Sequence, residues 1–131
     1  MGTEAFEGMQ LVIRIALAAV FVAMGVAHFF PGPGRRMAAM IPPFFRRAGW
    51  PSTKTLVRFT GLCEIAGGIG LLVPGLVVPA VLALIVFLVA VFPANASAAA
   101  DRARFGAVAI PFWPRLAGQV VLIALLVLVV V

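Results

Sequence analysis

Four polar residues stand inside or at the end of long apolar runs, and they are the candidates for chemistry. They are Glu64, His28, Asn95 and Gln119. A carboxylate and an imidazole can exchange protons, whereas the two amides can only donate and accept hydrogen bonds. The sequence therefore offers proton handling at Glu64 and His28, with Asn95 and Gln119 as hydrogen-bonding partners. No complete catalytic set is present, because no serine in an apolar run accompanies the histidine and the acid.

The apolar runs that carry these residues predict transmembrane helices. The chain has 131 residues, of which 64% are hydrophobic and 11% charged, whereas soluble domains average about 45–50% apolar and about 25% charged residues. A membrane-crossing helix needs about 20 apolar residues, so four such helices with their loops account for the chain. We expect an all-α, integral membrane, four-helix antiparallel bundle. It forms a single domain over residues 1–131, with helices at about 10–30, 53–73, 76–94 and 114–131.

The four polar residues are predicted to lie near one end of this bundle. Each residue of a helix rises about 1.5 Å, and this rise places the four side chains in a layer about 12 Å deep. Gly61 shares a helix face with Glu64, and Gly25 shares one with His28. Small residues let helices approach closely in a membrane. We therefore expect Glu64 to point into the bundle, toward His28 and Gln119.

Each candidate also has a purely structural interpretation. A carboxylate inside a membrane is costly enough that function is the default hypothesis, yet Glu64 could also hold helices together. Histidine costs little near the membrane surface, so His28 fits either role. Asn95 and Gln119 are better explained as amides that bridge or cap helices. The sequence leaves a ligand site and a structural polar layer as open alternatives.

The net charge of +6 is concentrated beside the apolar runs. Arginine and tryptophan in such positions are typical of anchors at the membrane surface, and this placement argues against nucleic acid as a partner. The anchoring candidates are Arg35, Arg36, Arg46, Arg47, Trp50, Arg58, Trp113 and Arg115. The segment 31–55 is predicted to lie in the interface, kinked at Pro42–Pro43. Because alternate loops hold the basic residues, the positive-inside rule predicts both termini outside.

The counts of histidine and cysteine exclude several cofactors. One histidine and one cysteine cannot supply this subunit alone with a bis-histidine haem, a zinc or iron site, or a disulfide. We therefore expect no metal site, and the electrons of any redox step would come from a partner.

Three segments of the sequence resemble a known family. They are GVAHFFPGPGRRMAAMIPPFF (25–45), TGLCEIAGGIGLLVPGL (60–76) and VFPAN (91–95). In this order and at these spacings they resemble the DoxX family of small bacterial membrane proteins. The resemblance implies a multi-pass protein of the bacterial inner membrane. It carries the family's recurring positions onto His28, Pro42, Pro43, Glu64, Gly68, Pro74, Pro93 and Asn95.

Two function classes stay open at this stage. The resemblance implies association with quinone-linked or oxidative-stress oxidoreductase systems, and a subunit of this kind would hold a quinone or similar apolar ligand against Glu64 and His28. The alternative is a non-catalytic assembly or scaffold protein, in which the polar layer only fixes helix register. A small transporter is disfavoured, because four short helices leave a narrow path unless the protein forms a homo-oligomer.

Overall fold

The computed structural model describes residues 2–41, 49–100 and 112–131, and this part of the chain is entirely helical. Its helices are α1 (Thr3–Ala27), α2 (Pro31–Met40), α3 (Thr53–Gly70), α4 (Val77–Ala100) and α6 (Phe112–Val130). The predicted all-α class is confirmed for these residues.

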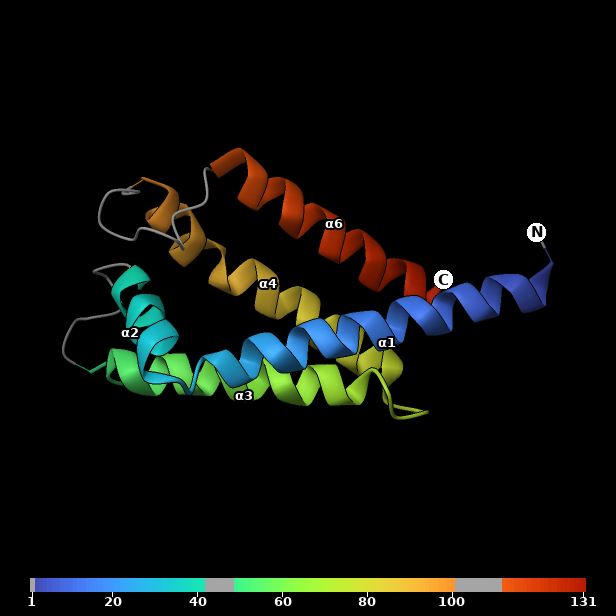
Figure 1. The fold of residues 1–131 in the computed structure, drawn as a ribbon, viewed down its shortest axis with the longest axis horizontal. Coiled ribbons are helices and arrows are strands. Elements are labelled where there is room, and N and C mark those ends of the chain that lie inside the picture. Colours follow the sequence, from blue (N-terminus) through green and yellow to red (C-terminus); the bar gives the residue numbers. More distant parts are fainter. Residues whose placement is uncertain (1, 42–48, 101–111) are drawn as a thin grey trace.

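The four long helices run in alternating directions along the molecule (Figure 1). α3 packs against α1 and α4, while α6 packs against α4 and α1. The short helix α2 lies where α1 ends and α3 begins, and both chain termini lie toward the other end (Figure 1). This arrangement brings the end of α1, with the candidate residue His28, beside the middle of α3, which carries Glu64.

Local chemistry explains where the helices begin and reverse. Ser52 caps α3, because its hydroxyl accepts a hydrogen bond from the Thr55 backbone nitrogen at 3.2 Å. Pro31 begins α2, a position where its missing amide hydrogen costs little. Between α3 and α4, Gly75 has φ +86°, a left-handed conformation that glycine adopts without strain. The chain can therefore reverse within a few residues and return α4 against α3.

The core lies where α1, α4 and α6 meet the end of α3. Its largest fully buried side chains are Phe21, Leu71, Leu84, Leu126 and Val81. Gly67 makes room for one of them, since a Cβ at this position would lie only 2.5 Å from a methyl carbon of Leu84.

The outward faces of the long helices are apolar. Among the described residues, far more large apolar side chains are exposed than are buried, and the exposed ones occur on all four long helices. Val12, Phe59 and Val86 are each more than 60% exposed. Two helices, Thr3–Ala27 and Trp113–Val130, are long and apolar enough to cross a membrane, and Val77–Phe92 is a shorter apolar helix. Soluble monomers rarely expose apolar surface on this scale.

Helix boundaries differ from the predicted ones, and α2 is an additional helix. α1 begins at Thr3 rather than near residue 10, because an acidic residue in the first turn, Glu4, suits a helix start. The interfacial segment predicted after His28 begins as the regular helix α2. α4 continues to Ala100 instead of ending near residue 94, since alanine is the strongest helix former. The predicted kink at Pro42–Pro43 lies outside the described residues.

Candidate functional site

His28 and Glu64 lie against each other between α1 and α3. The Nε2 atom of His28 is 3.1 Å from Oε2 of Glu64, and the two side chains are 11% and 4% exposed. Glu64 therefore points into the molecule, as its glycine neighbours predict, and the two groups able to exchange protons form one pair.

A close crossing of α1 and α3 at two glycines makes this contact possible. A Cβ on Gly25 would lie 2.7 Å from the carbonyl oxygen of Gly61. A Cβ on Gly61 would lie 2.7 Å from Cβ of His28. Ordinary carbon contacts are about 3.5–4.0 Å, so a larger residue would separate the helices. His28 thus packs on Gly61, and Glu64 follows one turn later on the same face of α3.

The backbone of α3 fixes which ring nitrogen of His28 carries a hydrogen. Nδ1 lies 2.9 Å from the carbonyl oxygen of Val57, which can only accept, so Nδ1 is the donor. The Thr60 hydroxyl gives its own hydrogen to the same carbonyl at 2.8 Å and lies 3.1 Å from Nδ1. With the hydrogen of the neutral ring on Nδ1, Nε2 is the nitrogen that can exchange a proton with Glu64, which it faces.

One proton of the pair can lie on either of two groups. Nε2 can carry it beside a Glu64 carboxylate, or Glu64 can carry it beside a neutral imidazole; the net charge of the pair is the same in both. Oε2 of Glu64 is buried and has no well-aligned hydrogen bond among the described residues, so its 3.1 Å approach to Nε2 is a close contact that becomes an ion pair when the imidazole carries both hydrogens. A small rotation of either side chain would align the proton for transfer.

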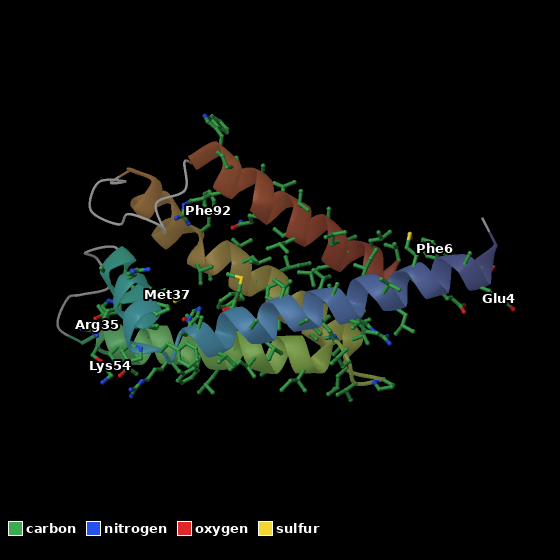
Figure 2. The ribbon with its side chains drawn as sticks, in the orientation of Figure 1. Glu4, Phe6, Arg35, Met37, Lys54 and Phe92 are labelled. Atoms are coloured by element: carbon green, nitrogen blue, oxygen red, sulfur yellow. The ribbon has the colours of Figure 1, made fainter. Side chains whose placement is uncertain are left out.

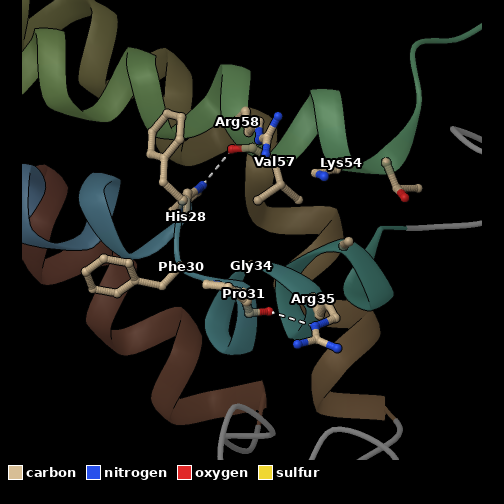
Figure 3. A pocket seen from close by; sticks show the side chains of 11 residues that line it. His28, Phe30, Pro31, Gly34, Arg35, Lys54, Val57 and Arg58 are labelled. Carbon is tan, nitrogen blue, oxygen red and sulfur yellow. Dashed lines mark hydrogen bonds between the residues drawn. The ribbon is translucent and has the colours of Figure 1, made fainter.

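A cavity of about 450 Å³ opens beside His28, between α2 and the beginning of α3. We call it the α2–α3 cavity (Figure 3). Its walls are formed by His28, Phe29, Phe30, Pro31, Gly34, Arg35, Ala38, Thr53, Lys54, Val57 and Arg58. His28 is the member of the proton-sharing pair that reaches this cavity, and Glu64 lies behind it. A ligand in the cavity would therefore reach Glu64 through the imidazole.

The cavity walls carry positive charge. Arg35 of α2 stands on one side, with its Nε donating to the Pro31 carbonyl oxygen at 3.0 Å, and α3 supplies Lys54 and Arg58 on the other (Figure 3). No carboxylate is among the residues that form the walls. The acidic residue Glu4 lies at the opposite end of the molecule (Figure 2). The end that holds the cavity is therefore electropositive.

Of the other two predicted site residues, Gln119 does not join the pair. Gln119 lies in the first half of α6, which stands apart from α1 and α3 (Figure 1), and no hydrogen bond connects it to His28 or Glu64. Asn95 lies in α4, but its side chain is outside the described part. Of the expected polar layer, the described side chains thus bring together His28 and Glu64, without Gln119.

The predicted anchoring residues occupy several positions. Arg35 and Arg58 line the cavity, whereas the neighbouring Arg36 is exposed and does not. Trp50 and Trp113 are exposed. Arg115 is partly buried at the beginning of α6, and Arg46 and Arg47 lie outside the described residues.

Several residues that matter here were missed by sequence reasoning. Thr60 precedes Glu64 by one helical turn, and this spacing could have identified it as a neighbour of the site. The Val57 carbonyl carries no such signal, because a backbone group is independent of residue type. Gln10 joins α1 to the end of α6 by donating to the Leu128 carbonyl oxygen at 2.9 Å, a contact that only the packing of the two helices determines.

The chain belongs to the family described as "Domain of unknown function (DUF8561)", whose model matches residues 17–130. The match includes both residues of the proton-sharing pair and all the residues that line the cavity. No curated protein matches the chain, and no solved structure does.

Proposed function

We propose that this member of the DUF8561 family is a multi-pass membrane subunit that binds an apolar ligand with a proton-accepting head group, such as a quinone, for a partner oxidoreductase. The observation that carries the proposal is the proton-sharing pair of His28 and Glu64 at the wall of a 450 Å³ cavity.

The membrane part of the proposal is supported by the outward faces of the helices. Large apolar side chains cover the long helices on the outside, while charged groups gather at the ends, as with Arg35, Lys54 and Glu4 (Figure 2). An apolar belt between two charged ends is the surface expected of a protein that faces lipid. The four long helices would each cross the bilayer, with α2 at its surface.

The cavity suits a ring-shaped head group. Phe29, Phe30 and Val57 give it apolar walls, while His28 supplies a titratable group. Typical small-molecule sites have volumes of about 300–1,000 Å³ and combine apolar walls with a few polar groups. A bound quinone would supply reversible uptake of electrons and protons at its ring oxygens. The residues of the chain need only orient the ring and handle the protons.

His28 and Glu64 would move one proton at a time between the ligand and the interior of the protein. A ligand oxygen would compete with the Val57 carbonyl for the Nδ1 hydrogen. As Nδ1 gives up this hydrogen, Nε2 would take one from Glu64, so the imidazole stays neutral at the end of the transfer. The electrons come from the partner oxidoreductase, because the described residues contain no metal-binding group and the chain has a single cysteine.

The resemblance to the DoxX family is part of this proposal. It supports a location in the bacterial inner membrane and quinone-linked or oxidative-stress oxidoreductases as partners. The basic end of the molecule would face the cytoplasm and both termini the outside, by the positive-inside rule.

A scaffold function is the second candidate, and the burial of the pair favours it. A contact between two nearly buried side chains across a glycine crossing would also serve to hold α1 and α3 in register. In that case the titration of Glu64 would have no consequence for activity.

Substitution of Glu64 separates the two functions. Glu64→Gln keeps the size and hydrogen bonding of the side chain but removes its proton, whereas Glu64→Ala removes both. We expect wild-type protein purified in mild detergent to contain quinone in its lipid extract, detected by mass spectrometry. We expect Glu64→Gln to fold but to lower the quinone-dependent turnover of the partner complex about a hundredfold.

Gln119→Leu is the matched control, because it removes a polar side chain from a membrane helix outside the pair. It should leave turnover unchanged. Full turnover with Glu64→Gln would reject proton transfer and leave the scaffold function. Absence of any quinone or similar ligand from the wild-type extract would reject the ligand site.

A further inference from the structure

The α2–α3 cavity has more positive charge than the proposed proton chemistry uses. Lys54 and Arg58 lie on one side and Arg35 on the other (Figure 3). None of the three forms an ion pair within the described part of the chain, where the acidic residues are Glu4, Glu7 and the buried Glu64. A cavity with three cations and no carboxylate in its walls fits an anionic group.

The surface that continues from the cavity along α3 is apolar. Lys54 and Arg58 are spaced by four residues, and Leu62 and Ile69 continue the same helix face. Leu62 is 58% exposed and Ile69 51%. One face of α3 therefore presents two cations at its beginning and exposed apolar side chains along the next turns. The complementary molecule has an anionic head and an apolar chain.

We infer that the basic side of the α2–α3 cavity binds the phosphate group of an anionic phospholipid through Arg35, Lys54 and Arg58, with the acyl chains lying along Leu62 and Ile69. The space beside His28 is left to the head group of the ligand in the proposed function. The inference rests on the membrane location in the proposed function, but not on proton transfer at His28 and Glu64. The lipid would be drawn from the cytoplasmic leaflet, which is the leaflet that attracts basic segments.

Arg36 provides a matched control for this inference. It neighbours Arg35 on α2 and carries the same charge, but it does not line the cavity. A general attraction of the basic end to anionic membranes would depend on Arg36 as much as on the cavity residues. A specific phosphate site would not.

The test is native mass spectrometry of detergent-solubilised protein mixed with phosphatidylglycerol or phosphatidylcholine of identical acyl chains. We expect wild-type protein and Arg36→Gln to retain phosphatidylglycerol in preference to phosphatidylcholine. In Lys54→Gln/Arg58→Gln this preference should fall about tenfold. Equal loss in Arg36→Gln, or no loss in the double variant, would overturn the inference.

Four further measurements keep the result decisive. Lys54→Arg/Arg58→Lys retains both charges and should retain the preference, which covers the case that the neutral double variant does not fold. Millimolar inorganic phosphate should not displace the lipid; displacement would identify a free phosphate site instead. Glu64→Gln should leave the lipid preference intact, so failure of proton transfer and failure of the lipid site are distinguishable. A wild-type protein extracted from membranes by alkaline carbonate would reject the membrane location itself.

Discussion

At His28 a backbone carbonyl determines which ring nitrogen exchanges a proton with Glu64. Val57 accepts from Nδ1 at 2.9 Å, and this leaves Nε2 to face Glu64. Thr60 adds a second acceptor oxygen near Nδ1, because its own hydroxyl hydrogen goes to Val57 and its lone pairs are free to accept. The imidazole is therefore held in one orientation before any ligand arrives, which is the usual condition for efficient proton transfer.

A double-mutant cycle tests whether His28 and Glu64 form a coupled pair. His28→Leu leaves a buried carboxylate without its partner, which we expect to lower the free energy of unfolding by about 3–5 kcal/mol. Adding Glu64→Leu removes the unpaired group, so the double variant should be more stable than His28→Leu alone. Thermal unfolding in detergent measures the stability of each variant. If the stability losses of His28→Leu and Glu64→Leu simply add in the double variant, the 3.1 Å contact contributes no coupling.

At the residue scale, the sequence predicts the pair but not its surroundings. An acid inside an apolar run, with glycines on its own face, indicates an inward side chain whatever the details of packing. Gln119 was placed near the pair from helix rise alone. Rise fixes the depth of a residue, but it does not fix the distance between helices, and α6 separates from α1 and α3 at that depth (Figure 1).

At the element scale, the crossing of α1 and α3 depends on Gly25 more than on any large side chain. A Cβ added there would lie 2.7 Å from the Gly61 carbonyl oxygen and 2.6 Å from a side-chain carbon of Ile65. The side chain of Ile65 can rotate, but the carbonyl belongs to the backbone of α3 and can move only with the helix. The two helices must then separate, which also lengthens the contact between His28 and Glu64.

Gly25→Ala is therefore expected to destabilise the protein by about 1–3 kcal/mol and to weaken ligand retention at the same time. Gly118→Ala is the control, since a Cβ at that helical glycine meets nothing within 4 Å. It should be neutral or stabilise by up to about 1 kcal/mol, through helix propensity alone. Thermal unfolding of the two variants in the same detergent gives the comparison. Equal effects would mean that the crossing tolerates a methyl group.

The elements themselves were predictable to different degrees. The long apolar runs indicate four helices because composition and length suffice for that prediction. The helix α2 was not predicted, because its sequence PGPGRRMAAM contains two prolines and two glycines, which usually mark a loop. Both prolines lie within the first three residues of α2, where proline is compatible with a helix.

At the scale of the whole molecule, alternating helix directions place both termini toward one end and the basic cavity at the other (Figures 1 and 2). The described basic residues between α1 and α3 lie at the cavity end, whereas residues 101–111, in the other loop predicted to be basic, lie outside the described residues. Sequence alone could not fix the end at which the cavity forms, since Arg35 and Arg58 are brought together only by the packing of α2 on α3.

The orientation of the molecule in a membrane gives the last prediction. Arg35, Arg36, Lys54 and Arg58 lie at the cavity end, whereas the charged residues at the beginning of α1 are Glu4 and Glu7. Because basic segments are retained in the cytoplasm, a fluorescent reporter that matures only there should stay dark when fused to either terminus. The same reporter inserted after Gly49, in the segment between α2 and α3, should fluoresce. Bright fusions at both termini would reverse the orientation but keep an even number of crossings, whereas one bright and one dark terminus would contradict the alternating arrangement of the helices.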